Sequence, residues 1–447
     1  MADSVSRMDQ VLSQALSQVL NQTLTACHEQ RLVVAFSGGM DSSVLLHAVK
    51  QWQQTHRPEL GVLAVHVHHG LSPQADGWAN FCQQQCQAWQ VPLEVHRVVV
   101  ATRTGSLEQA ARQARYQVFD AVCEPGDVLL QGHHGDDQLE TRLMRMTRGS
   151  GLAGLTGIPL SRPLSPDSGV LIQRPFLSLR RRELAQYAAS YGLDWIEDES
   201  NQDTRFERNW WRQDVLPRVE QRFPGRLNAM LASTEALRSD AEALSYLLQP
   251  LLTQCVRPCE WPLATPDRLS ITALLQQPTV LQNSLLRSWL LSQGVQAPSL
   301  RQLQQLFHGV IHTAADAMPS LRLGTEVIRR YRDWLVVCHG ALPEASHSEA
   351  PYSEIRQLSP ASGLNWLGQH WSLDGIVEGE YQVTCLDQSP ECARMTLTPA
   401  GRPGKRLKAL WQEAGVPPWL RPLWPLLLQQ QTLRAIPQVA VDARNAA

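Results

Sequence analysis

The sequence contains no long apolar run. No segment approaches the roughly 18 to 20 consecutive apolar residues of a membrane-spanning helix, and the opening MADSVSRMDQ lacks the regions of a signal peptide. These absences predict a protein without a membrane partner and make the cytoplasm the expected location. Apolar residues still make up 43% of the 447, as in soluble globular proteins, and the length predicts two to four domains.

Cysteine pairs with redox or metal-site spacing are also absent. Nine cysteines are dispersed along the chain and none forms a Cys-x-x-Cys motif, so we expect reduced thiols that are mostly buried. Cys82 and Cys86, four residues apart in a predicted helix, are expected to pack in the core, because too few other ligands lie close in sequence.

Charge of one sign is not in excess either. The formal net charge is only −2, so any surface for nucleic acid must come from local clusters of basic residues. Between residues 393 and 421, Glu413 is the only acid among the basic residues Arg394, Arg402, Lys405, Arg406, Lys408 and Arg421. Such a run is either solvated surface or a contact for a polynucleotide backbone. Further basic candidates are Arg142, Arg145, Arg148 and Arg180 to Arg182.

The most informative segment combines an apolar strand, a glycine-rich turn and a helix. Residues 31–36 are followed by Ser37-Gly38-Gly39-Met40-Asp41-Ser42 and then by an amphipathic stretch. This order directs several backbone N–H groups and a helix N-terminus at one point, which suits a pyrophosphate group. The lysine of a Walker A loop and the GxGxxG of a dinucleotide site are both missing.

The first half of the chain alternates strand-like and helix-like segments, which predicts a parallel α/β sheet. The expected strands are 31–36, 61–67, 92–99, 127–131 and 170–174, and the expected helices are 42–54, 75–90, 106–123 and 136–148. Ligands of such sheets bind beyond the carboxyl ends of the strands. The segments 37–42, 66–70 and 133–137 all follow strands, so we expect them to meet at one crevice.

Two acids in the segment HHGDDQLET, which starts at His133, are candidates for chemistry. Helical spacing places Asp137 and Glu140 side by side, away from the apolar stripe of their helix. Paired carboxylates near a triphosphate hold Mg²⁺ or orient an amine, and Asp41 is a further candidate for the metal. Asp136 is explained by the helix dipole. Arg208 either belongs to a capped helix start or stabilises charge on a transferring group.

The second half of the chain changes in character. From Pro217, apolar residues recur at helical spacing, so we expect a catalytic domain at 1–216 and a helical domain at 217–342. A polar, proline-containing stretch at 343–355 is expected to be a linker. Residues 356–447 mix short apolar segments with turns and form a small C-terminal α+β domain in this scheme.

Taken together, the motifs resemble those of the tRNA(Ile)-lysidine synthetase family of PP-loop ATP pyrophosphatases. They are SGGMDS at 37, HVHHGLSPQAD at 66, HHGDDQLET at 133, RGSG at 148, WIEDESNQD at 195 with Arg208-Asn209, and GKRLKALWQEAGVPPWLR at 404. The resemblance implies an N-terminal parallel-sheet PP-loop domain of the adenine nucleotide α hydrolase-like type, then the helical and C-terminal domains.

The activity implied by this resemblance is modification of a tRNA. ATP adenylates the oxygen on carbon 2 of the wobble cytidine in the CAU anticodon of tRNA(Ile) and releases pyrophosphate. The amine of free L-lysine then displaces AMP to give lysidine. ATP binding would fall on Ser37, Gly38, Gly39, Met40, Asp41 and Ser42, catalytic or orienting roles on Asp137, Glu140 and Arg208, Mg²⁺ on Asp41 and Asp137, and tRNA binding on Arg402, Lys405, Arg406 and Lys408.

Alternatives to this interpretation use the same loop. A tRNA-thiolating PP-loop enzyme would need a nucleophilic cysteine or an iron–sulfur cluster near ATP, and the absence of Cys-x-x-Cys disfavours it. A homodimer and a monomer both remain open. So does the division of metal binding and lysine binding between the carboxylates.

Overall fold

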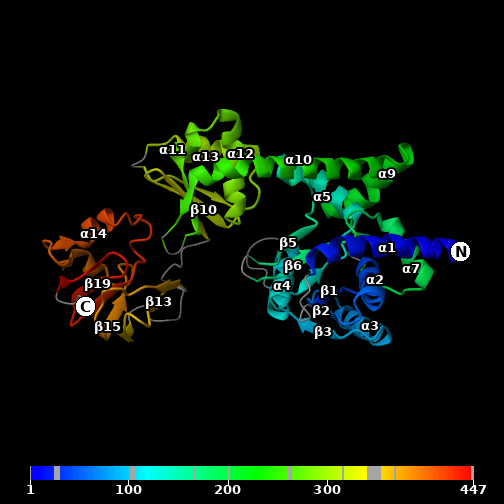
Figure 1. Ribbon diagram of the computed structural model, residues 1–447, viewed down its shortest axis with the longest axis horizontal. Helices are drawn as coiled ribbons and strands as arrows, with labels where there is room; N and C mark the ends of the chain where they lie inside the picture. The colour runs from blue at the N-terminus through cyan, green and yellow to red at the C-terminus, as the bar shows by residue number, and fades with distance from the viewer. Residues whose placement is uncertain are drawn as a thin grey trace. The chain divides into compact units, whose positions relative to one another are not determined.

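The computed structural model describes residues 2–24, 31–100, 107–165, 168–198, 202–259, 261, 264–314, 317–339, 354–366 and 369–443. Two compact units divide the chain, Met1–Ala243 and Leu244–Ala447 (Figure 1). The domain boundaries predicted at residues 216, 342 and 355 stay predictions. Residues 343–353 of the predicted linker lie outside the described residues.

A six-stranded sheet forms the centre of the first unit, in the order β3-β2-β1-β4-β6-β5. Its strands are β1 (Arg31–Ala35), β2 (Gly61–His68), β3 (Leu93–Arg97), β4 (Val128–Leu130), β5 (Ser161–Pro163) and β6 (Leu171–Gln173). All neighbouring strands are parallel except β5, which pairs antiparallel with β6 at the edge. The predicted parallel sheet is confirmed.

Helices cover both faces of this sheet, as the buried apolar residues of its central strands β1 and β4 require. They are α1 (Ala2–Thr23), α2 (Met40–His56), α3 (Ala75–Ala88), α4 (Leu107–Val122), α5 (Gly135–Thr147), α6 (Leu152–Leu155) and α7 (Arg181–Tyr191). Leu32 and Val34 of β1 belong to a core cluster with α1, α2 and α7. Val33 points to the other face, where it joins Phe119 of α4 in a second cluster.

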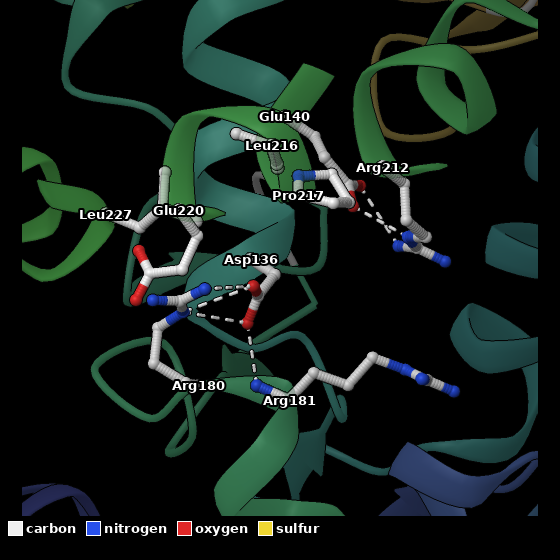
Figure 2. Close-up of a pocket in the computed structure, with 9 residues that line it drawn as sticks. All are labelled: Asp136, Glu140, Arg180, Arg181, Arg212, Leu216, Pro217, Glu220 and Leu227. Atoms are coloured by element: carbon white, nitrogen blue, oxygen red, sulfur yellow. Dashed lines mark hydrogen bonds and ion pairs between the residues drawn. The ribbon is translucent and has the colours of Figure 1, made fainter. Parts of the chain in front are cut away.

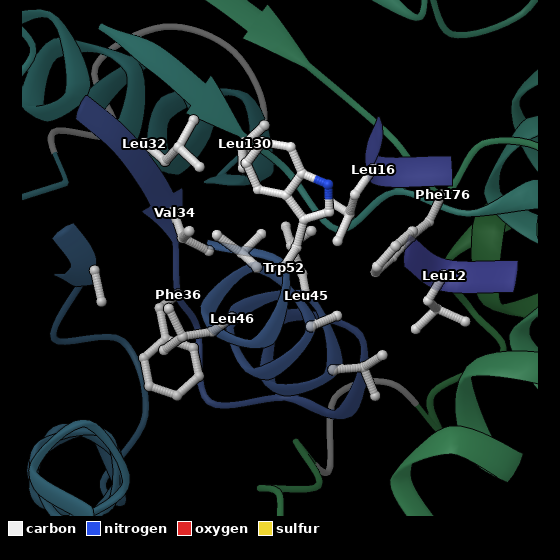
Figure 3. Close-up of a cluster of buried hydrophobic side chains, with 14 of the residues drawn as sticks. Leu12, Leu16, Leu32, Val34, Phe36, Leu45, Leu46, Trp52, Leu130 and Phe176 are labelled. Atoms are coloured by element: carbon white, nitrogen blue, oxygen red, sulfur yellow. The ribbon is translucent and has the colours of Figure 1, made fainter. Parts of the chain in front are cut away.

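The first of these clusters includes a helix that the sequence analysis did not predict. Leu12 and Leu16 of α1 are buried beside Trp52 of α2 and Phe176 (Figure 3). The Trp52 indole N–H donates a hydrogen bond to Ser17 Oγ at 2.8 Å. Helix α1 therefore closes one face of the sheet. Cys82 and Cys86 are buried in the same cluster, which confirms their predicted packing role.

The chain leaves the sheet through a series of helical segments. They are α8 (Glu207–Trp210), the π-helical turn η2 (Trp211–Val215), α9 (Leu216–Arg222) and α10 (Arg226–Cys255). Leu139 of α5 packs with Leu216 and Leu227 in a small apolar cluster. This contact holds α8 and η2 beside α5, and the first unit ends within α10.

The second unit begins with helices packed on a five-stranded antiparallel sheet, in the order β7-β8-β11-β10-β9. The strands are β7 (Val256–Pro258), β8 (Asp267–Ser270), β9 (Ser320–Leu323), β10 (Glu326–Tyr331) and β11 (Trp334–His339). The helical segments are α11 (Ile271–Gln276), α12 (Thr279–Ser292), α13 (Leu300–Leu306) and η3 (Phe307–Ile311). The helices were predicted from their spacing, whereas the sheet was not.

The C-terminal part is built on a second antiparallel sheet, in the order β12-β15-β18-β19-β20. Its strands are β12 (Glu354–Leu358), β15 (Gly379–Thr384), β18 (Leu426–Gln429), β19 (Thr432–Ile436) and β20 (Ala440–Val441). Two small hairpins and two helical segments complete it: β13 (Leu364–Trp366) with β14 (Gln369–Trp371), β16 (Thr396–Leu397) with β17 (Lys405–Arg406), η4 (Pro390–Arg394) and α14 (Leu407–Glu413). This is the α+β mixture expected. Across the described residues, no helix is both long and apolar enough to cross a membrane.

Candidate active site

The loop between β1 and α2 is held in shape by its own serines. The Ser37 amide donates to Ser42 Oγ at 3.3 Å, and the Ser42 hydroxyl donates to the Gly39 carbonyl at 2.9 Å. Helix α2 begins at Met40, so the first N–H groups of the helix have no partner within it and face the open end of the loop. Such amides bind anions. The predicted strand, loop and helix are present.

Close packing under the loop explains its glycine. Gly38 has φ +83°, and a Cβ there would lie 2.7 Å from Ile196 Cδ1 and 2.9 Å from Cys82 Sγ. The Ile196 amide also donates to the Gly38 carbonyl at 2.9 Å. The motif beginning at Trp195 therefore docks against the loop, although residues 199–201 of that motif lie outside the described residues.

Helix α5 starts at the same edge of the sheet and is capped by a histidine. The His134 amide donates to Asp137 Oδ2 at 2.9 Å, and the Asp137 amide donates to His134 Nδ1 at 3.4 Å. This reciprocal cap fixes both side chains at the helix start. His134 is fully buried and Asp137 is 7% exposed.

Two arginines clamp the two candidate acids. Arg208 on α8 donates to Glu140 Oε2 at 2.8 Å and to Asp137 Oδ1 at 2.7 Å. Arg212 on η2 donates to Glu140 Oε1 at 2.7 Å and to Asp137 Oδ1 at 3.0 Å. We call these four residues the acid clamp. The predicted proximity of Asp137, Glu140 and Arg208 is present, with Glu140 fully buried.

Charge balance keeps Asp137 of the acid clamp ionised. Burial disfavours the charged form of Asp137, but His134, Arg208 and Arg212 together hold its pKa far below the usual value. Burial likewise opposes the charge on Arg212, whose pKa is nevertheless raised by Glu140 and Asp137. Two positive and two negative groups thus cancel inside a poorly hydrated site.

His134 connects the acid clamp to the nucleotide loop. Its Nε2 atom lies 3.5 Å from Asp41 Oδ2 and 3.6 Å from Asp137 Oδ2. Burial lowers the pKa of His134, but Asp137 and Asp41 outweigh burial and the net pKa is raised. One imidazole therefore lies between the loop acid and the clamp acid.

The two predicted metal ligands differ in what their oxygens already bind. Both Asp137 oxygens accept hydrogen bonds, Oδ1 from the arginines and Oδ2 from the His134 amide. Asp41 Oδ1 is buried and has no hydrogen-bond partner. Mg²⁺ commonly takes one or two carboxylates together with phosphate oxygens and water, so Asp41 fits this ion and Asp137 in this arrangement does not. Within the described ranges, no group of three or more His, Cys, Asp or Glu residues that could hold a metal ion is present.

A pocket of about 300 Å³ opens beside Glu140 and contains side chains of both charges (Figure 2). Its lining residues are Asp136, Glu140, Arg180, Arg181, Arg212, Leu216, Pro217, Glu220 and Leu227. Asp136 accepts hydrogen bonds from Arg180 Nη2 at 2.7 Å, from Arg180 Nε at 3.1 Å to each carboxylate oxygen, and from the Arg181 amide at 2.6 Å. Glu220 Oε2 is buried without a hydrogen-bond partner. The pocket thus combines cations, acids and an apolar wall.

Sequence analysis missed two residues of this site. Arg212 lies four residues after Arg208, and that helical spacing is the signal that would have indicated a second arginine on the same side. His134 was given no role of its own within the motif HHGDDQLET. Its position three residues before Asp137 is the spacing of a capping box.

Some of the further arginines named as nucleic-acid candidates bind the protein itself. Arg142 donates to the Met230 carbonyl at 2.9 Å, Arg145 donates to the Gly157 carbonyl at 2.6 Å, and Arg180 is held by Asp136. These three guanidinium groups stabilise the packing around α5.

The basic residues of the C-terminal part gather at β17 and α14. Lys405 forms an ion pair with Glu413, while Arg402, Arg406 and Lys408 are exposed. The exposed cations are suitably placed for a backbone contact, and their role in tRNA binding remains a prediction.

Comparison with protein families places three models along the chain. A PP-loop domain matches residues 8–219, a TilS substrate binding domain matches residues 269–336, and a TilS substrate C-terminal domain matches residues 390–447. The first match contains the loop, His134 and the acid clamp, so the site lies in the part of the chain assigned to ATP binding.

Relatives with assigned names resemble nearly the whole chain. The tRNA(Ile)-lysidine synthase of Salmonella choleraesuis (strain SC-B67) is 37% identical over 420 residues, 94% of each chain, and that of Escherichia coli O157:H7 is 38% identical over 410 residues, 91% of each chain. Among solved structures, the U34-tRNA thiolase NcsA from Methanococcus maripaludis is 15% identical with a TM-score of 0.43, covering 52% of this chain and 80% of that one.

Proposed function

Because the chain belongs to the tRNA(Ile)-lysidine synthase family, we propose how its own residues divide the family's reaction. This reaction is an ATP-dependent ligation: carbon 2 of the wobble cytidine in the CAU anticodon of tRNA(Ile) receives lysine. Adenylation of the cytidine O2 releases pyrophosphate. The lysine side-chain amine then forms the new C–N bond and AMP departs with O2, which changes codon and aminoacylation specificity from methionine to isoleucine.

The adenylation step falls on the loop Ser37–Ser42. Unpaired amides at the start of α2 would hold the departing pyrophosphate. Asp41 would hold Mg²⁺ through Oδ1, which has no hydrogen-bond partner and lies 3.9 Å from Arg181 Nε. Bound there, the ion would neutralise charge that develops on the leaving group. His134 keeps Asp41 oriented from the side of the protein.

Free L-lysine is assigned to the pocket beside the acid clamp. The half-exposed Arg181 suits the carboxylate of the amino acid, and the unpartnered Glu220 Oε2 suits an ammonium group. Leu216 and Pro217 supply an apolar wall for the methylene groups (Figure 2). These features support an amino acid that carries charges at both ends.

The acid clamp would orient the attacking amine. Glu140, which lines the pocket, would hold the ammonium group, and the proton that this group must lose before it attacks carbon 2 would leave through water in the pocket. Arg208, 37% exposed in its side chain, can also contact the adenylyl phosphate. The observation that carries this proposal is the link from Asp41 through His134 to Asp137, which joins the phosphate loop to the acids.

We propose a binding surface for the tRNA from the exposed basic residues of the C-terminal part. The exposed Arg402, Arg406 and Lys408, with Lys405, would hold the backbone of tRNA(Ile). We also propose a cytoplasmic location and a homodimer. The thiolating alternative is disfavoured because burial raises the pKa of Cys82, the cysteine beside the loop, to about 12 and keeps its thiol protonated.

Lysine incorporation tests the proposed function directly. The full-length protein is incubated with Mg·ATP, labelled lysine and a tRNA(Ile) transcript that carries CAU. We expect labelled tRNA together with AMP and pyrophosphate in equal amounts. A transcript with a uridine at the wobble position is the control and should stay unlabelled. Absence of label from intact CAU transcript would remove the proposal.

A further inference from the structure

A second group of arginines surrounds one tyrosine on the same sheet, outside the loop and the acid clamp. Tyr116 and Arg112 lie on α4, Arg162 on β5, and Arg174 directly follows β6. The group is completed by Gln131, the residue after β4. We call these five residues the tyrosine cluster. Gln131 and Arg174 follow parallel strands, so the cluster lies at the carboxyl edge of the sheet.

The cluster is compact and its contacts are specific. The guanidinium carbons of Arg112 and Arg162 lie 5.0 and 4.9 Å from the centre of the Tyr116 ring. Arg112 Nη2 donates to the Tyr116 hydroxyl at 3.2 Å, and Gln131 Nε2 donates to it at 3.3 Å. Gln131 Oε1 in turn accepts from Arg174 Nε at 3.2 Å.

No acid balances these cations. Among the described residues, Arg112, Arg162 and Arg174 form no ion pair with a carboxylate; their oxygen partners are backbone carbonyls, Gln131 and the Tyr116 hydroxyl. Arg174 is only 2% exposed. A buried charge is expensive unless it is paired, so three neighbouring guanidinium groups without an acid favour an external anion.

Hydrogen bonding at the Tyr116 hydroxyl points to the same kind of ligand. Its oxygen already accepts from Arg112 and Gln131, and no acceptor for its own proton is present among its described partners. A phosphate oxygen would accept that proton while it contacts the guanidinium groups, which carry only donors.

The tyrosine cluster lies at the same edge of the sheet as the acid clamp. Gln131 stands three residues before His134, in the segment that joins β4 to α5, and the carboxyl ends of parallel strands meet at one edge of a sheet. Burial is the main cause that lowers the pKa of His133 to about 3; Arg174 of the tyrosine cluster also lowers this pKa, whereas Asp137 of the acid clamp raises it.

We propose that the tyrosine cluster is a phosphate-binding site in which Tyr116 and Arg162 contact phosphate oxygens of a substrate. The inference rests on the proposed function, which brings two phosphate-bearing substrates to this edge of the sheet. Their sources differ: a phosphodiester flanking the target cytidine, or the polyphosphate of ATP. Both offer the same oxygens, and binding measurements separate them.

Two variants test the site without removing its packing. Tyr116→Phe keeps the ring and deletes the hydroxyl, and Arg162→Gln removes one charge from an edge strand. Dissociation constants are measured for a CAU anticodon stem-loop RNA and, separately, for the magnesium complex of an ATP analogue with a methylene group between the α and β phosphates. We expect each variant to weaken one ligand about tenfold, as for a lost charge-assisted hydrogen bond.

A matched control removes one charge at the opposite edge of the sheet. Arg57 follows α2, ahead of β2, and pairs with the exposed Glu59. Arg57→Gln should leave both affinities within about twofold, as expected for a surface change. Loss of RNA binding alone, with a salt dependence shallower by about 0.7 per lost contact, assigns the site to the phosphodiester. Loss of nucleotide analogue binding alone assigns it to ATP.

The proposal is overturned if Tyr116→Phe and Arg162→Gln both bind RNA and nucleotide analogue as the unaltered protein does. Circular dichroism and a thermal midpoint confirm that each variant is folded before binding is compared. These measurements need no turnover, so a protein that fails to incorporate lysine can still show the site. Conversely, if the affinities for RNA and for the nucleotide analogue are both unchanged, the phosphate site is ruled out even when lysine incorporation is intact.

Discussion

The acid clamp and the tyrosine cluster are two arginine-rich regions of one sheet, and they differ in their counterions. In the clamp, Arg208 and Arg212 meet two carboxylates at 2.7 to 3.0 Å, and the charges cancel within the protein. In the cluster, the described oxygen partners of Arg162 and Arg174 are backbone carbonyls and the Gln131 amide, and Arg162 also lies over the Tyr116 ring. Paired charge is a device for holding side chains in place, whereas unpaired charge is a site that a ligand can complete.

The largest effect is expected on breaking the clamp. Glu140→Ala leaves two arginines facing one carboxylate inside a buried site, and we expect the free energy of unfolding to fall by about 3 kcal/mol. Arg162→Gln in the tyrosine cluster should cost less than about 1 kcal/mol, since a stacked cation and an exposed hydrogen bond to the Pro163 carbonyl are lost. Urea denaturation of both variants measures the contrast.

Glu140→Gln refines this experiment, because it keeps the shape and removes only the charge. It should fall between the alanine variant and the unaltered protein in stability and should still fail to incorporate lysine. Equal stability losses in the clamp and in the cluster would contradict the distinction between paired and unpaired arginines.

The next largest effect is expected at Asp41, the acid of the nucleotide loop, whose Oδ1 has no hydrogen-bond partner. Asp41→Asn removes the charge that would hold Mg²⁺, and we expect pyrophosphate release to fall about 100-fold, in line with the several kcal/mol a catalytic metal ion supplies. Stability should change less than on breaking the clamp, because the Asp41 side chain is 31% exposed and its contacts with His134 and Arg181 are long, at 3.5 and 3.9 Å. Release of pyrophosphate is followed over a range of Mg²⁺ concentrations, with chelation of the ion as the control. Undiminished release would assign the metal elsewhere.

How far the fold could be predicted depends on how local its determinants are. The parallel strands were predictable because each is a short apolar run between turn signals, as at β1 and β2. Helix α1 was not predictable, because its sequence is largely polar. Its apolar residues are buried only because Trp52 and Phe176, which are distant in sequence, pack against them. The sheet of the second unit was missed because β8 is four residues long and pairs with β11, more than sixty residues later.

The same division applies to the site. Adjacent positions on α5 follow from helical spacing, so Asp137 and Glu140 were predictable as a pair. Arg212 approaches Glu140 across 72 residues of sequence, and no local pattern specifies that contact. The tyrosine cluster brings together α4, β4, β5 and β6 and escaped sequence analysis for the same reason.

A smaller effect, on tRNA affinity, is expected from the basic residues of the C-terminal part. The double variant Lys405→Ala with Arg406→Ala should weaken tRNA(Ile) binding about tenfold and make its salt dependence shallower, while ATP analogue binding stays unchanged. The variant Glu413→Gln frees Lys405 from its ion pair and should strengthen binding slightly. Arg257→Ala with Arg356→Ala, which removes the same charge from positions of the unit outside both TilS domain matches, is the control. Full affinity in the first variant would show that these cations are only solvated surface.

The smallest effect is a titration. Burial favours the protonated phenol of Tyr116, but Arg112, Gln131 and Arg162 outweigh it and lower the pKa from 10.0 to about 8. Between these two pH values the unfolded chain binds more protons than the folded chain, so Tyr116 should add stability as pH rises from about 8 to 10. Ultraviolet absorbance of tyrosinate, taken as the difference from Tyr116→Phe, measures the pKa.

The Tyr116 pKa, measured with and without ligand, also tests whether a ligand phosphate binds in the tyrosine cluster. A phosphate group in the tyrosine cluster neutralises the guanidinium groups that lower the pKa and accepts the phenol proton, so both contributions would move the Tyr116 pKa back towards its ordinary value. Saturating anticodon stem-loop RNA, or the ATP analogue, should therefore reduce tyrosinate absorbance at pH about 9. The acid clamp, whose arginines already have counterions, should give no such response, and an unchanged Tyr116 pKa with both ligands would place the phosphate outside the cluster.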